Sequence, residues 1–188
     1  DPNDYRDTIS AQVEQATGRE FSIDGDLSVS VFPWVAVEVG SAALGNGTGY
    51  GDEPMVRFDS ARLSVKLLPL VLQQTVQVGT AALEGFEANL AVAADGRTNW
   101  GELMDTLAAS ETEEASADES STEFSLDIDN VVLSDARVVY TDAQTGDRYE
   151  LTNVNFNTGR IALDSAFDID GGFDFSAAPA NVSGDVGM

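Results

Sequence analysis

The 188-residue sequence contains no cysteine and no histidine. Disulfides, thiol nucleophiles, histidine-based triads and zinc sites built from these residues are therefore excluded. Basic residues are scarce too, because nine lysines and arginines face 33 aspartates and glutamates, for a formal net charge of −24. Such an acidic surface repels phosphate backbones, so we expect no nucleic-acid partner. The charge fits either plain solubility or a salty, charge-screened environment, and we favour the second.

Long apolar runs are missing as well. The longest, residues 31–37 and 67–72, are short, and a proline interrupts each. Because a membrane-spanning helix needs about 20 apolar residues, the sequence predicts none within the chain. The chain begins at Asp1 rather than at methionine, and we expect a longer parent that carries any anchor.

Signals for catalysis or metal binding are weak. Asp127 and Asp129 alternate with apolar residues and would share the wet face of a strand, but no aromatic platform for a sugar stands beside them in the sequence. Asp168 and Asp170 resemble part of a calcium loop, yet the distal glutamate of such a loop is absent. We therefore expect no enzymatic activity, no cofactor and no metal.

The hydrophobic pattern predicts one helix followed by many strands. Tyr5, Ile9 and Val13 recur at helical spacing, which predicts an amphipathic helix over residues 4–17 that ends at Gly18 and packs on one end of a sheet. A second short helix is predicted over residues 99–109. Alternating apolar residues predict strands over residues 21–31, 35–39, 56–67, 76–83, 87–92, 124–133, 137–140, 149–156, 160–163 and 167–175, with a bulge near residue 59.

The second half of the chain repeats the first at an offset of 50 residues. The repeated positions are Val76, Val78, Ala81, Leu83, Ala88, Leu90 and Gly96, and their counterparts are Leu126, Ile128, Val131, Leu133, Val138, Tyr140 and Gly146. One such unit cannot bury its own sheet face, so we expect the two units to stack into a longer sheet. Chance similarity between two amphipathic hairpins is the alternative.

An acidic, serine-rich stretch divides the chain. Residues 110–121 lack aromatic side chains and predict a flexible linker. We therefore expect a first unit at residues 1–109, with the N-terminal helix, and a second unit at residues 122–188. Alternation alone cannot tell a packed core from an open groove. The residues that would line a groove are Ile23, Leu27, Val29, Val37, Val39, Phe58, Leu63, Val65, Val78, Leu90, Leu126, Ile128, Val138 and Tyr140.

Several short motifs, in order along nearly the whole chain, resemble the AsmA family. They include the stretches from Thr17 to Leu27, from Phe32 to Trp34, from Asp95 to Trp100 and from Tyr140 to Asp142. The acidic linker departs most from the family pattern. The resemblance implies a mainly β fold with two short helices, in which repeated units build a curved antiparallel β-sheet with an apolar groove.

The resemblance also implies a function in Gram-negative bacteria. Such proteins are anchored in the inner membrane by an N-terminal helix, here missing, and otherwise lie in the periplasm. The implied role is outer-membrane biogenesis, by binding phospholipid acyl chains and conducting them between the inner and outer membranes. The alternative is a periplasmic scaffold or chaperone-like module that assists outer-membrane protein assembly and contacts the assembly components.

Overall fold

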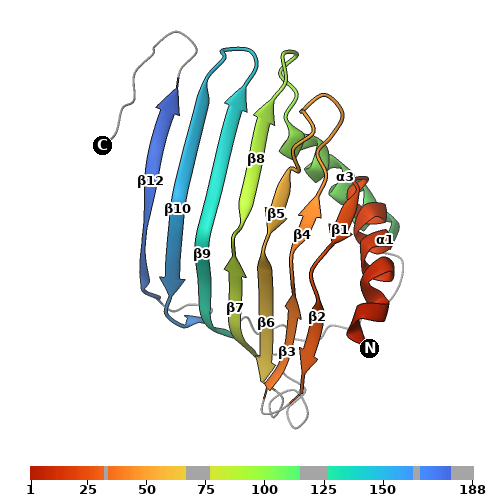
Figure 1. Ribbon diagram of the computed structural model, residues 1–188, viewed down its shortest axis with the longest axis vertical. Coiled ribbons are helices and arrows are strands. Elements are labelled where there is room, and N and C mark those ends of the chain that lie inside the picture. The colour runs from red at the N-terminus through yellow and green to blue at the C-terminus, as the bar shows by residue number, and fades with distance from the viewer. Residues whose placement is uncertain (32–33, 67–76, 115–126, 163–165, 179–188) are drawn as a thin grey trace.

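The computed structural model describes residues 1–31, 34–66, 77–114, 127–162 and 166–178. Twelve strands form one open, curved sheet, and the helices lie together near its β1 end (Figure 1). The helical elements are η1 (Pro2–Tyr5), α1 (Arg6–Thr17) and α3 (Asn99–Glu114). The strands are β1 (Phe21–Ile23), β2 (Leu27–Ser30), β3 (Trp34–Val39), β4 (Ala42–Leu44), β5 (Val56–Phe58), β6 (Ser60–Lys66), β7 (Val78–Glu84), β8 (Glu87–Val92), β9 (Asp127–Asp142), β10 (Arg148–Thr158), β11 (Ile161–Ala162) and β12 (Ile169–Ala178). The predicted mainly β fold with two short helices is confirmed.

Helix α1 ends where the sequence predicts. Gly18 takes a left-handed conformation with φ of 66°, and its N–H donates to the carbonyl of Glu14 at 2.8 Å. Glycine adopts this conformation without the penalty that a Cβ brings, so it stops the helix. Helix α1 contacts both β1 and α3.

Most strands form one half of a longer, interrupted strand, which we call a ribbon. The pairs β1–β2, β3–β4, β5–β6 and β7–β8 each follow one another after a short interruption. Neighbouring ribbons in this series pair antiparallel, and β9, β10 and β12 complete the sheet. The interruptions lie at residues 24–26, 40–41, 59 and 85–86, and β9 and β10 are distorted at Asp135 and Asn153.

These interruptions form one line across the sheet, which we call the crease. Backbone hydrogen bonds connect neighbouring interruptions, from Gly25 to Ser41 at 2.9 Å, from Asp59 to Glu84 at 2.9 Å and from Gly85 to Ser134 at 2.9 Å. Gly25 approaches Gly40 so closely that a Cβ on either would collide with the other's backbone. Because bulges bend a strand and increase its twist, a row of them curves the whole sheet.

The crease also keeps apolar side chains on one face. Before the crease the apolar residue Phe58 has an even number, whereas after the crease Ala61 and Leu63 have odd numbers. Asp59 is the extra residue that causes this change. Val39 packs with the buried cluster that Phe58 also contacts, and it lines the same hollow as Ala61 and Leu63. The predicted bulge near residue 59 is therefore confirmed, and it restores the hydrophobic face that a single-residue shift would otherwise reverse.

The 50-residue repeat is confirmed by the register of the sheet. Strands β7 and β8 pair with β9 so that residue i lies beside residue i+50, from Val78 beside Ile128 to Val92 beside Asp142. The turn glycines Gly96 and Gly146 both have positive φ. Positions 76 and 126 lie outside the described residues.

The repeat pairing is parallel, which corrects the prediction of a wholly antiparallel sheet. Strands that run in the same direction need a long crossover, and the connection from Val92 to Asp127 contains α3. The sheet is therefore mixed: of the strand pairs within the described ranges, β7 with β9 and β8 with β9 are parallel, and the others are antiparallel.

The remaining differences concern element boundaries. Strand β4 is not predicted from the sequence, and β9 is one strand where two were expected. Helix α3 continues through Glu114, into the predicted linker, while residues 115–126 lie outside the described residues. The two predicted units share one sheet through β9.

Candidate functional site

One side of the sheet carries apolar residues in rows that cross the strands. The register gives three rows. The first contains Leu27, Val39, Ala61, Leu83, Leu133 and Phe156, and the second contains Val29, Val37, Leu63, Ala81 and Val131. The third contains Val35, Val65, Val78, Ile128 and Ile161. We call this surface the apolar face. Because strands alternate their side chains, such rows arise only if every strand keeps the same side of the sheet apolar.

Part of the apolar face is hollowed and open. A hollow of about 650 Å³ lies over β3, β6, β7, β9 and β10. Its lining is formed by Val37, Val39, Ala61, Arg62, Leu63, Ala81, Ala82, Leu83, Val131, Val132, Leu133 and Phe156. Val37 and Leu63 are 44% and 47% exposed, although they are large apolar side chains in the middle of a sheet. A contiguous exposed apolar surface of this kind is typical of an interaction site.

The β1 end of this face is closed by packing. Ile23, Leu27 and Ala42 form a buried cluster, against which Phe21 and Phe58 pack. This is the core that an isolated sheet face would lack.

Beyond the crease, aromatic rings extend the face from α3 towards the β12 edge. The ring of Trp100 lies 6.2 Å from that of Tyr140, Tyr140 lies 5.9 Å from Tyr149, and Tyr149 stacks on Phe175 at 6.3 Å. Tyr140 belongs to β9 and Trp100 to α3, so the contact places the start of α3 over this part of the apolar face.

The structure divides the sequence-predicted groove residues into four groups. Those that line the hollow are Val37, Val39 and Leu63; those on the apolar face beside it are Val29, Val65, Val78 and Ile128. Those in or against the buried cluster are Ile23, Leu27 and Phe58, and those beyond the crease are Leu90, Val138 and Tyr140. Leu126 lies outside the described residues.

Sequence reasoning missed several residues of the hollow. They are Ala61, Arg62, Ala81, Ala82, Leu83, Val131, Val132, Leu133 and Phe156. Four of them, Ala81, Leu83, Val131 and Leu133, belong to the 50-residue repeat, so the repeat was the signal that could have identified these four.

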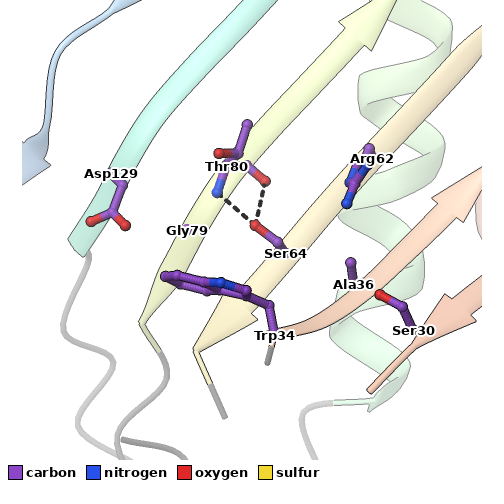
Figure 2. Close-up of a pocket in the computed structure, with 8 residues that line it drawn as sticks. All are labelled: Ser30, Trp34, Ala36, Arg62, Ser64, Gly79, Thr80 and Asp129. Atoms are coloured by element: carbon purple, nitrogen blue, oxygen red, sulfur yellow. Dashed lines mark hydrogen bonds between the residues drawn. The ribbon is translucent and has the colours of Figure 1, made fainter. Parts of the chain in front are cut away.

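The opposite face is polar. Ser64 on β6 accepts a hydrogen bond from the backbone N–H of Thr80 at 2.7 Å (Figure 2). Thr80 donates through its hydroxyl to Asn130 at 2.7 Å. Asp129 forms an ion pair with Lys66 at 2.8 Å. The carboxylate of Asp129 thus has a structural partner in Lys66. The side chain of Asp127, the other member of the predicted pair, lies outside the described residues.

A charged ladder crosses the same polar side beyond the crease. Glu87 accepts from Arg57 at 2.7 Å and faces Arg137 at 3.4 Å, and Arg137 donates to Glu150 at 2.7 Å. Burial raises the pKa of Glu87, but hydrogen bonds from Arg57 and Asn89 outweigh burial, so the pKa lies below its usual value. Hydrogen bonding to Arg137 likewise lowers the pKa of Glu150.

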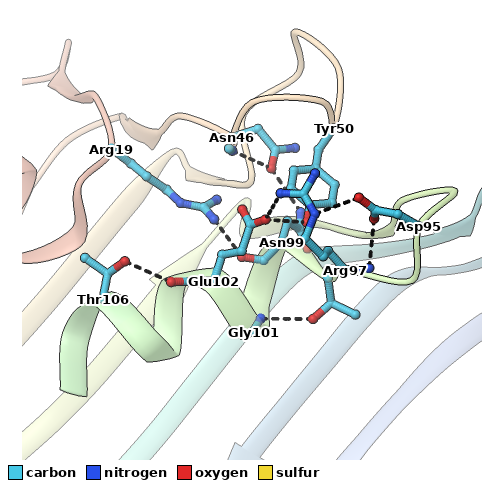
Figure 3. Close-up of polar contacts among 11 residues, drawn as sticks. Arg19, Asn46, Tyr50, Asp95, Arg97, Asn99, Gly101, Glu102 and Thr106 are labelled. Carbon is cyan, nitrogen blue, oxygen red and sulfur yellow. Dashed lines mark hydrogen bonds and ion pairs between the residues drawn. The ribbon is translucent and has the colours of Figure 1, made fainter. Parts of the chain in front are cut away.

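A polar network fixes α3 to the sheet (Figure 3). The fully buried side chain of Asn99 accepts from the N–H of Ala91 at 3.0 Å and donates to the carbonyl of Asn89 at 2.7 Å and to Asn46 at 3.1 Å. The carbonyl of Asn99 accepts from the buried Arg19 at 2.6 Å. Asn99 thus pairs with the edge of β8 as a neighbouring strand would, and it sets where α3 begins.

Two further observations concern metal-binding clusters and membrane-spanning helices among the described residues. Among the residues that the structure describes, no group of three or more acidic side chains is placed to hold a metal ion. Within the same residues, neither helix is long and apolar enough to cross a membrane.

Two comparisons with known proteins point to the same family. A model of the AsmA family matches residues 1–185 of the chain. Protein AsmA of Escherichia coli (strain K12) is 39% identical over 74 residues, which cover 39% of this chain and 12% of that protein. The match thus spans well under two thirds of the relative's length.

Proposed function

Because the chain belongs to the AsmA family, we propose that it is part of an inner-membrane-anchored periplasmic protein of outer-membrane biogenesis that binds phospholipid acyl chains. In this proposal the acyl chains lie on the apolar face and move along it between the two membranes. Membership in the family suggests a role related to the outer membrane, and the transfer of lipid is the finer step that we add. No catalytic residue and no cofactor take part.

The observation that carries the proposal is the open hollow of about 650 Å³ on the apolar face. Strands lie about 4.8 Å apart, so the four spacings from β3 to β10 measure about 19 Å along the sheet. An acyl chain reaches across about half of the roughly 30 Å hydrocarbon core of a bilayer. A whole acyl chain therefore fits across the strands.

The energetics favour exchange over tight capture. Each buried CH₂ contributes about 0.8 kcal/mol, so twelve of them contribute about 10 kcal/mol. That is of the same order as the cost of association, about 4–15 kcal/mol. Moderate binding without a specific site suits a surface along which a chain must move.

A charge placed in the hollow tests the proposal. Leu63→Glu adds a carboxylate at a side chain that is already 47% exposed, so the fold should survive. We expect wild-type protein to retain phospholipid in native mass spectrometry and to bind a fluorescent fatty acid, and Leu63→Glu to lose both.

The matched control is Ser28→Glu, which adds the same charge to an exposed position on the polar side of β2. It should bind lipid as wild type does. Equal lipid binding by Leu63→Glu and wild type, with both folded by circular dichroism, would contradict the proposal.

The exposed edge of β12 favours a second candidate function, a scaffold for outer-membrane protein assembly. Among the strands that the structure describes, β12 pairs with β10 alone, and its Ile169 and Phe173 are 66% and 65% exposed. An edge of this kind can accept a strand from another chain. A co-purified peptide, in place of lipid adducts, would favour this candidate.

A further inference from the structure

The polar side of the sheet contains a second hollow, across the sheet from the apolar face. It measures about 520 Å³ and is lined by residues of β2, β3, β6, β7 and β9 (Figure 2). Its floor consists of the small residues Ala36, Ser64 and Gly79, and the larger side chains of Trp34 and Arg62 stand beside them. The depression results from this difference in size.

Trp34 forms one wall of this second hollow. The edge of its indole lies on Gly79, where a Cβ would come within 3.2 Å of Cζ3. Figure 2 shows the indole edge-on, with one flank towards Ser64 and Thr80. The side chain of Lys66, which is held by Asp129, lies with Nζ 5.8 Å from the ring centroid and steadies the ring by a cation–π contact. Trp34 is still 41% exposed.

Polar groups at the rim complete the second hollow. Arg62 approaches Glu38 only at 3.9 Å, beyond hydrogen-bond distance, so its planar donors can serve a ligand. Asp129 receives Lys66 on Oδ1, and its other oxygen is an acceptor. Ser30 adds a hydroxyl.

We propose that this second hollow binds a neutral saccharide chain. A sugar ring has an apolar C–H surface, which packs on an aromatic flank, and hydroxyl groups that pair with a planar donor and a carboxylate acceptor at its edge. The net charge of −24 disfavours an anionic ligand. The second hollow lies on the side of the sheet opposite the proposed lipid-binding surface, although Arg62 lines both hollows, and saccharide binding does not depend on lipid binding.

The chain has only two tryptophans, which makes the test direct. In a Trp100→Phe protein, all tryptophan emission comes from Trp34. We expect the neutral trisaccharide chitotriose to change this emission saturably, and no saturable change would overturn the proposal. Inorganic phosphate should not compete, and competition by phosphate would overturn it in favour of an anion site.

Two variants and a control locate the site by saturation-transfer NMR of chitotriose. Trp34→Ala should weaken binding about tenfold, as expected for one lost aromatic contact, and Arg62→Ala should also weaken it. Ser134→Ala, a control on the polar side of β9, should bind as wild type does, as should the fluorescent fatty acid to Trp34→Ala. Unchanged chitotriose binding by folded Trp34→Ala would contradict the assignment; if that variant unfolds, the emission measurement decides alone.

Discussion

Replacing Asn99 by alanine tests whether this one side chain fixes α3 to the sheet. The substitution removes three hydrogen bonds, to Ala91, Asn89 and Asn46, and leaves two backbone groups of β8 without these partners. At about 1 kcal/mol for each hydrogen bond, the free energy of unfolding should fall by about 3 kcal/mol. That is a large share of the roughly 5–15 kcal/mol that stabilises a typical protein.

Urea unfolding followed by circular dichroism measures this loss. Asn157→Ala is the matched control, because Asn157 is exposed and its described hydrogen bond, to Asn130, is long at 3.4 Å. It should cost at most about 0.5 kcal/mol. Asn99→Asp keeps the volume but turns the donating group into an acceptor that faces two other acceptors, so it should destabilise at neutral pH as well. Equal stability of Asn99→Ala and Asn157→Ala would refute the reasoning.

Two further predictions concern the charged ladder and the crease. The folded pKa of Glu87 is lowered, so its contribution to stability is present above the unfolded pKa of about 4.3 and is lost as pH falls through the folded value. Glu87→Gln should therefore flatten the decline in unfolding free energy below about pH 4.3, as measured by urea unfolding at a series of pH values, and an unchanged decline would contradict this. Gly85→Ala should lower the melting temperature more than Gly51→Ala, because both have positive φ but only at Gly85 would the new Cβ meet Asp59. Equal melting temperatures would contradict the steric role of Gly85.

The local pattern of the strands could be predicted because each strand keeps one side apolar. The offset of 50 residues predicted that two repeated units stack in one sheet, and the structure adds that residue i lies beside residue i+50, as in the pair of Leu83 and Leu133. The strand direction did not follow from that offset alone, because two similar bent strands can pair in either direction, and the parallel direction here needs the crossover that contains α3. The shift near residue 59 was visible, but its alignment with Gly25 and Gly85 into one crease depends on register between distant strands.

The candidate surface could be predicted only in part for a related reason. Leu27 and Leu63 have the same alternation in sequence, yet Leu27 is buried and Leu63 is exposed. The exposure of the two side chains differs because Leu27 lies at the end of the sheet near the helices and Leu63 does not. The alternation of apolar residues does not show where the helices pack. The role of Asn99 was hidden as well, because an asparagine that pairs with a strand edge looks in sequence like any polar residue at a helix start.

The side of the sheet on which lipid lies is the central claim, and photo-crosslinking measures it directly. A phospholipid with a photoactivatable group in its acyl chain would be incubated with the protein, irradiated and mapped by peptide mass spectrometry. The account predicts adducts at Val37, Leu63 and Leu83 in the hollow of the apolar face. Adducts concentrated at Ser28 and Glu38 on the polar side, or spread equally over both sides, would contradict it.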